Sequence, residues 1–167
     1  MIYVRDMYEV IIKSRFSAAH QLRHLGGICE NLHGHNWNVD IHVISEKLND
    51  IGVVIDFEAV ENVAKKIIED QFDHQVLNEI PYFQDVNPSA ENIARYLFEE
   101  INRALSCSHD ERRDSSPPPR VALAQNDPGY HEHGHPEARS AEGSQHAAVV
   151  KKVTVWETDT CGASYSC

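Results

Sequence analysis

The chain has 167 residues, of which 41% are hydrophobic, and this favours one domain with a single core. Its net charge is −11 without any block of Lys or Arg, which disfavours nucleic acid and membrane surfaces as partners. No apolar run is long enough to cross a membrane, and the charged N-terminal stretch reads as a strand rather than a signal peptide. The four cysteines form no regular framework, so we expect a cytoplasmic protein.

Two strands are predicted first. Residues 8–20 alternate between apolar and polar side chains, and His20 continues the parity of the apolar face. Residues 35–45 alternate again, after a connection that Gly26, Gly27 and Gly34 interrupt. We therefore expect an antiparallel pair joined by a long functional loop.

Two amphipathic helices are predicted next. Asp56 should cap a first helix that ends before residue 72, and Ser89 should cap a second helix. Both have apolar side chains at helical spacing, as expected for helices on one face of a sheet. The buried stripe of the second helix is predicted to be Ile93, Leu97, Ile101 and Leu105.

The C-terminal stretch returns to strand character over residues 148–158, and a short strand is predicted at 163–167. One face of the longer strand is predicted to hold Val149, Lys151, Val153 and Val155. Strand, strand, helix, helix, strand and strand is an α+β order, unlike the alternation that builds a parallel α/β sheet.

Between about residues 107 and 148 the periodicity is lost, and this stretch holds five of the seven prolines. We predict a mobile insertion within a single domain that spans residues 1–167. The HEHGH tract at 131–135 is interpreted as solvated or as an incidental metal-binding sequence.

The segment CENLHGHNW, residues 29–37, concentrates reactive side chains. His33 and His35 are two residues apart at the start of a strand, so both imidazoles can project to the same side. A hairpin would bring His20, at the end of the preceding strand, close to them. Three neutral imidazoles with an open fourth position match a catalytic zinc site. From the residues alone, a zinc site and ordinary surface histidines both remain open.

Five further side chains are candidates for chemistry. Cys29 is either a small buried hydrophobe or a thiolate activated by a nearby cation, and Glu30 is either a solvated acid or a second base. His74 is either a capping or surface residue, or an imidazole that Asp73 orients for proton transfer. Glu157, at the end of a strand, is either solvated or an acceptor for the paired N–H donors of a heterocycle.

In combination, these motifs resemble the 6-pyruvoyl-/6-carboxy-tetrahydropterin synthase family. The resemblance covers nearly the whole chain except residues 107–148. The matching segments, in the family's order, are FSAAH (16–20), CENLHGHNW (29–37), GVVIDF (52–57), FDHQVLN (72–78), NPSAENIA (87–94) and VWET (155–158).

The resemblance implies the T-fold, an antiparallel four-stranded sheet with two helices on one face, which assembles into a β-barrel oligomer. The expected assembly is a homohexamer, a dimer of trimers, with active sites between subunits. The implied substrate is 7,8-dihydroneopterin triphosphate, and the implied cofactor is Zn²⁺.

The resemblance also implies roles for individual residues. Zinc would be held by His20, His33 and His35. Cys29 would be the general base, Asp73 and His74 would relay protons, and Glu157 with Thr158 would bind the pterin. No G-x-G-x-x-G element is present, which is consistent with a reaction that needs no nicotinamide or flavin.

The sequence patterns are compatible with more than one product. The spacing from Cys29 to His33 resembles that of the 6-carboxy type of the queuosine route. Glu30 also satisfies the pattern of a folate-related branch that forms 6-hydroxymethyl-7,8-dihydropterin, so either product or both remain open. A non-catalytic zinc-binding protein, whose site Cys29 would close, is the alternative of another class. Possible phosphate partners, if they are not simply surface charges, are Lys13, Arg15 and Arg23.

Overall fold

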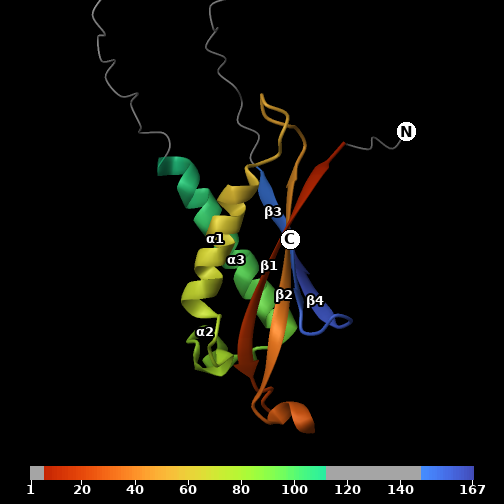
Figure 1. The fold of residues 1–167 in the computed structure, drawn as a ribbon, viewed down its shortest axis with the longest axis vertical. Coiled ribbons are helices and arrows are strands. Elements are labelled where there is room, and N and C mark those ends of the chain that lie inside the picture. Colours follow the sequence, from red (N-terminus) through yellow and green to blue (C-terminus); the bar gives the residue numbers. More distant parts are fainter. Residues whose placement is uncertain (1–5, 112–147) are drawn as a thin grey trace, which may run out of the picture.

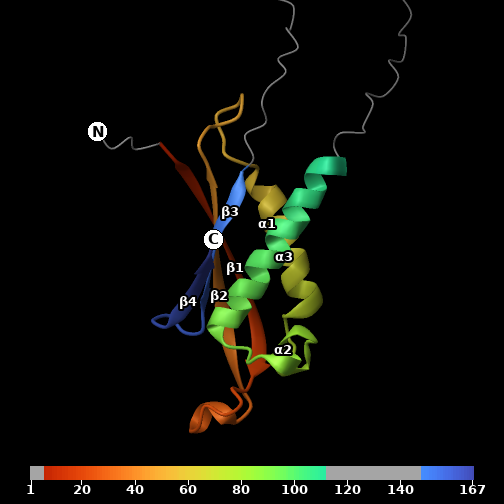
Figure 2. The same ribbon diagram turned by 180° about the vertical axis from the view of Figure 1, so that it is seen from behind.

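A computed structural model describes residues 6–111 and 148–167. One antiparallel sheet has the strand order β1-β2-β3-β4. The strands are β1 (Tyr8–His20), β2 (His33–Ser45), β3 (Val149–Trp156) and β4 (Gly162–Ser166). The helices are α1 (Phe57–Gln71), α2 (Tyr82–Asp85) and α3 (Ala90–Glu111), with 3₁₀ turns η1 (Ile28–Glu30) and η2 (Leu77–Glu79). Figure 1 and the reverse view in Figure 2 show α1 and α3 on the same face of the sheet. This is the predicted α+β arrangement.

The long β1–β2 ladder keeps one register from Tyr8 opposite Ser45 to His20 opposite His33. Because side chains alternate along a strand, this register places the apolar parity of both strands toward the helices. The fully buried members from β2 are Trp37, Val39, Ile41 and Val43, which confirms the alternation predicted for this strand. β2 begins at His33, two residues earlier than the predicted strand.

The alternation predicted for β3 is wrong in its first half. A register shift between His42 and Val43 pairs these residues with Lys152 and Val150, so Lys151 is the extra residue of a β-bulge. Val150 is therefore buried, whereas Val149 is 47% exposed. Past the bulge, Val153 and Val155 face the core as predicted. Sequence parity fails here because a bulge changes the face of every residue before it.

The helices begin where the caps predict. The Asp56 carboxylate accepts a hydrogen bond from the Glu58 N–H, and Ser89 Oγ lies 3.5 Å from the Asn92 N at the start of α3. The α3 stripe Ile93, Leu97 and Ile101 is fully buried.

α3 continues through Cys107 to Glu111, so it extends a few residues into the stretch, from about residue 107, that was assigned to the insertion. Residues 112–147, including the HEHGH tract, lie outside the described part of the chain. Within residues 6–111 and 148–167, no helix combines the length and apolar character needed to cross a membrane.

Candidate functional site

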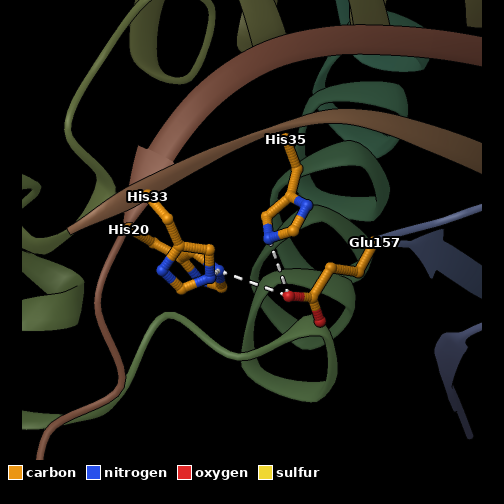
Figure 3. Close-up of side chains that lie close together, drawn as sticks. All are labelled: His20, His33, His35 and Glu157. Atoms are coloured by element: carbon orange, nitrogen blue, oxygen red, sulfur yellow. Dashed lines mark hydrogen bonds and ion pairs between the residues drawn. The ribbon is translucent and has the colours of Figure 1, made fainter. Parts of the chain in front are cut away.

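Three histidines meet where β1 ends and β2 begins. His20 is the last residue of β1 and is paired with His33, the first residue of β2, while His35 follows on the same face. The ring centroid of His20 lies 4.6 Å from that of His33 and 5.3 Å from that of His35. Figure 3 shows the rings turned toward one another. The predicted meeting of the three imidazoles is therefore confirmed.

Backbone carbonyls fix the tautomers of two of these rings. His20 Nδ1 lies 2.7 Å from Pro88 O, and His33 Nδ1 lies 2.7 Å from Asn31 O. Because a carbonyl oxygen only accepts, each Nδ1 carries the proton in the neutral ring and each Nε2 presents a lone pair. The Nε2 atoms of His20 and His33 are 3.1 Å apart. Two lone pairs at that distance repel each other unless a cation lies between them.

Glu157, the residue directly after β3, completes the cluster. Its Oε1 lies 2.9 Å from His35 Nε2 and 3.4 Å from His20 Nε2, as Figure 3 shows. His35 Nε2 is buried and makes no hydrogen bond despite this short distance. The ligand atoms of His20, His33, His35 and Glu157 all lie within 4.8 Å of one another.

This donor set fits a divalent metal ion. Zinc binds imidazole nitrogen at about 2.0–2.1 Å, which separates two ligands of a tetrahedral site by about 3.3 Å. The separation of 3.1 Å between the two Nε2 atoms matches that geometry. The proton on each Nδ1 is held by a carbonyl, as is usual for metal-bound histidines. His20, His33 and His35 would hold the ion, with Glu157 beside its fourth position.

The environment of His20 favours the neutral ring that a metal requires. Its side chain is completely buried, and burial is the main cause that lowers the pKa of His20 below its ordinary value of 6.5. The neighbouring His33 and His35 act in the same direction, while the Pro88 carbonyl and Glu157 oppose them. A neutral His20 at pH 7 is ready to donate its Nε2 lone pair.

Cys29 and Glu30 lie in η1, the turn beyond the end of the sheet shown at the bottom of Figure 1. Cys29 is half-buried and Glu30 is exposed. Within the described residues, the group with converging ligand atoms includes neither of them. The assignment of Cys29 or Glu30 as the base therefore stays a prediction.

Asp73 and His74 pair beside the edge strand β1. Asp73 Oδ1 accepts the Ser17 N–H at 2.9 Å, and its Oδ2 lies 3.6 Å from His74 Nε2. The His74 side chain is 81% exposed, and the residue has a positive φ of 57°. Both residues line a cavity of about 370 Å³ together with Arg15 and Asn36. Among the described residues, His74 is not part of the converging metal-ligand group.

A larger cavity, of about 750 Å³, opens beside Glu157. It lies between the segment after β1, the start of α3 and the β3–β4 turn. Its polar lining residues that were not predicted as functional from the sequence include Glu91, Asn92 and Cys161. Glu91 and Asn92 could have been found as polar residues in the first turn of a predicted helix that follows a loop. Cys161 carries no such signal.

Thr158 has a clear structural contact. Its Oγ1 accepts the Cys161 N–H at 3.0 Å, and its own N–H donates to Cys161 O at 3.2 Å. These bonds close the β3–β4 turn that carries Glu157. The predicted pterin contacts of Glu157 and Thr158 remain predictions.

The three candidate cations differ in their partners. The Arg23 guanidinium donates to three backbone carbonyl oxygens between residues 83 and 86. Lys13 Nζ lies 3.7 Å from Asp40. Arg15 makes no ion pair with any carboxylate in the described part of the chain. Of the three, only Arg15 keeps its charge free for an anionic ligand.

The fold is that of a known class of enzymes. A family model described as 6-pyruvoyl tetrahydropterin synthase matches residues 9–116, and the chain belongs to that family. A 6-carboxy-5,6,7,8-tetrahydropterin synthase of Rickettsia felis is 33% identical over 111 residues, 57% of this chain and 80% of that protein.

Solved structures agree on the fold. The 6-pyruvoyl tetrahydropterin synthase of Caenorhabditis elegans has a TM-score of 0.63 at 21% identity, covering 99% of both chains. A Plasmodium vivax 6-pyruvoyltetrahydropterin synthase, described as a catalytic residue mutant in which alanine replaces a glutamate, has a TM-score of 0.59 at 18% identity, covering 96% of this chain and 97% of that one. The chain therefore has the T-fold and is an enzyme of the tetrahydropterin synthase type.

Proposed function

We propose that this enzyme is a zinc-dependent lyase that converts 7,8-dihydroneopterin triphosphate to 6-carboxy-5,6,7,8-tetrahydropterin, with loss of triphosphate and of the two outer side-chain carbons as acetaldehyde. The observation that carries the proposal is the convergence of three imidazoles, two of them with a carbonyl-fixed tautomer, on one point beside Glu157. The 6-carboxy name of the Rickettsia felis relative supports this product over the 6-pyruvoyl product. The corresponding route would be that of queuosine, in the cytoplasm.

Each residue then has a chemical task. Zinc, when bound, supplies Lewis acidity that makes the hydroxyl and adjacent C–H groups of the substrate side chain more acidic. Cys29 Sγ removes a proton from that side chain. His74, oriented by the Asp73 carboxylate 3.6 Å away, supplies or accepts a second proton. Glu157 orients the substrate from the wall of the 750 Å³ cavity. Triphosphate leaves by elimination.

Glu30 supports a second candidate product. The name of the Plasmodium vivax mutant describes the replaced glutamate as a catalytic residue of that protein, and CENLHGH places a glutamate next to Cys29. With Glu30 as the base, the bond between the first two side-chain carbons would be cleaved to give 6-hydroxymethyl-7,8-dihydropterin, the folate-route product. The outer two carbons would leave with the triphosphate as an aldehyde. One active site would then give two products according to which base acts.

Product analysis of two single variants tests both candidates. Wild-type protein, Cys29→Ala and Glu30→Ala are incubated with 7,8-dihydroneopterin triphosphate, and the pterins are separated. We expect Cys29→Ala to lose the 6-carboxy product and Glu30→Ala to lose any 6-hydroxymethyl product. An unchanged pattern in Glu30→Ala would show that the second base is idle. If wild-type protein with added zinc forms no pterin product, the proposed reaction is wrong.

We also propose that the active enzyme is a homohexamer whose sites are completed between subunits. The support is that His74 is 81% exposed on the edge of the sheet and stands outside the metal-ligand group. Among the described residues, no proton relay lies beside the metal centre of the same chain. A second copy that packs along this edge would place its own metal centre beside the exposed His74. Light scattering measures the assembly, and a monomer with full activity would overturn this arrangement.

A further inference from the structure

Two residues that follow β1, Gln21 and Arg23, are each held by an asparagine in the same way. The Gln21 N–H donates to Asn78 Oδ1 at 2.8 Å, and Asn78 Nδ2 returns a bond to Gln21 O at 2.9 Å. The Arg23 N–H donates to Asn87 Oδ1 at 2.8 Å, and Asn87 Nδ2 returns a bond to Arg23 O at 2.9 Å. A primary amide presents one donor edge and one acceptor, as a neighbouring strand does. Each asparagine side chain thus pairs with the backbone that follows β1 as a neighbouring strand would.

The second of these pairs is connected to a metal ligand. Arg23 also donates to three carbonyl oxygens between residues 83 and 86, at 2.6–2.9 Å, which fixes the chain just before Asn87. The next residue, Pro88, accepts the buried Nδ1–H of His20 at 2.7 Å. The reciprocal bonds of Arg23 and Asn87, together with the bond from Asn92 Nδ2 to Asn87 O at 2.9 Å, therefore hold the chain directly before the Pro88 carbonyl.

The same segment also holds the loop of the proposed base. The Leu22 N–H donates to Cys29 O at 2.9 Å. His20 and the η1 turn are in this way attached to one short stretch of backbone. A displacement of that stretch would move a metal ligand and Cys29 together.

We propose that Asn87 and Arg23 are positioning residues for the metal centre, which act on His20 through the Pro88 carbonyl. The inference rests on the proposed function only in taking the three histidines as metal ligands. Loss of the Asn87 amide leaves the Arg23 N–H and carbonyl without partners and frees the Pro88 carbonyl to move. The acceptor that fixes the tautomer and ring direction of His20 is then held less firmly. Removal of such a partner weakens metal binding by about 10- to 100-fold.

Zinc affinity tests the proposal without any pterin. Full-length wild-type protein, Asn87→Ala and Arg23→Lys compete for zinc with a chromophoric chelator, and the melting temperature of each metal-free protein is measured alongside. The matched control is Asn102→Ala, because Asn102 Nδ2 also donates to a backbone carbonyl, Phe98 O at 3.1 Å, but within α3. We expect an about 10- to 100-fold weaker zinc affinity for Asn87→Ala. Asn102→Ala should bind zinc as wild type does.

The cobalt(II) form gives a second readout. A turned His20 ring changes the ligand field, so the visible bands of Asn87→Ala should shift while those of Asn102→Ala should not. Arg23→Lys keeps the charge but lacks the forked donors that reach three carbonyls, so its affinity should also fall. If Asn87→Ala does not fold, Arg23→Lys decides. Wild-type zinc affinity and cobalt bands in the folded variants would overturn the proposal, whereas a wild-type protein that binds no zinc would instead overturn the proposed function.

Discussion

His20 and His33 face each other across the last pair of the β1–β2 ladder, with their Nε2 atoms 3.1 Å apart. The Nδ1–H of each ring donates to a backbone carbonyl, that of Pro88 for His20 and that of Asn31 for His33. The two lone pairs are therefore held toward each other by the fold and not by mutual attraction. A cation between the two Nε2 atoms would remove the repulsion of their lone pairs and so stabilise the folded protein.

His33→Ala should remove zinc binding while leaving the fold intact. His33 is only partly buried and stands at a strand end, so its truncation creates little cavity, whereas His20 is fully buried. We expect at least a ~10³-fold loss in kcat/KM, because the Lewis acid is lost with its ligand. Metal content is measured by elemental analysis and activity by pterin separation. The control is His24→Asn, an exposed histidine whose positive φ of 66° asparagine tolerates. Full zinc content in His33→Ala would contradict this prediction.

Much of the site geometry could be predicted from the sequence because it depends on strand parity. His20 shares the parity of Phe16 and Ala18, and His33 and His35 share that of Trp37, so two alternating strands suffice to bring them to one face. Strand parity did not predict the position of Glu157 beside the histidines. Its approach to His35 depends on the β2–β3 register, which pairs Trp156 with Asn38, and on the tight β3–β4 turn, and neither has a clear sequence signal.

The proton relay also could not be placed from the sequence. The D-H pair predicts a carboxylate that orients an imidazole, and the two side chains do pair at 3.6 Å. Where the pair lies is decided by the hydrogen bond from the His74 N–H to Ser17 O, which attaches the segment to the edge of β1. Long-range backbone contacts of this kind connect residues that local patterns treat as independent.

The metal-free protein should lose stability in acid because of His20. Burial lowers the pKa of His20 in the folded state below its ordinary value of 6.5, so below pH 6.5 the unfolded chain binds a proton that the folded chain does not. The free energy of unfolding is therefore highest above pH 6.5 and should fall by up to about 1.4 kcal/mol per pH unit as the pH drops toward the folded-state pKa.

Denaturant unfolding of chelated protein between about pH 5 and 8 measures this dependence. His20→Gln removes the titrating ring and should flatten the curve over that range. A slope that survives unchanged in His20→Gln would assign the effect to other groups.

Arg15→Ala should weaken binding of the triphosphate substrate. Arg15 lines the cavity that holds Asp73 and His74 and has no carboxylate partner in the described part of the chain. We expect KM to rise about 10-fold, with a smaller change in kcat, because a charge-assisted contact to a phosphate is lost. Added salt should reduce the difference between wild type and variant. Lys13→Ala, which removes a cation already near Asp40 at 3.7 Å, should leave KM within about twofold. Equal KM values for all three proteins would mean that Arg15 does not contact the phosphates.

Mixing two inactive variants should restore activity if sites are shared between subunits. Cys29→Ala lacks the proposed base and His74→Ala lacks the proposed relay, so neither alone should form the 6-carboxy product, which is the activity to be measured. In a randomly mixed oligomer of equal parts, about one quarter of the sites combine an intact Cys29 with an intact His74 from a neighbour. Activity near that fraction of wild type is expected after the subunits have exchanged, and none when each variant is assayed alone. If mixed oligomers form but stay inactive, Cys29 and His74 act within the same subunit, and the exposed His74 must reach the metal centre by a movement of its own chain.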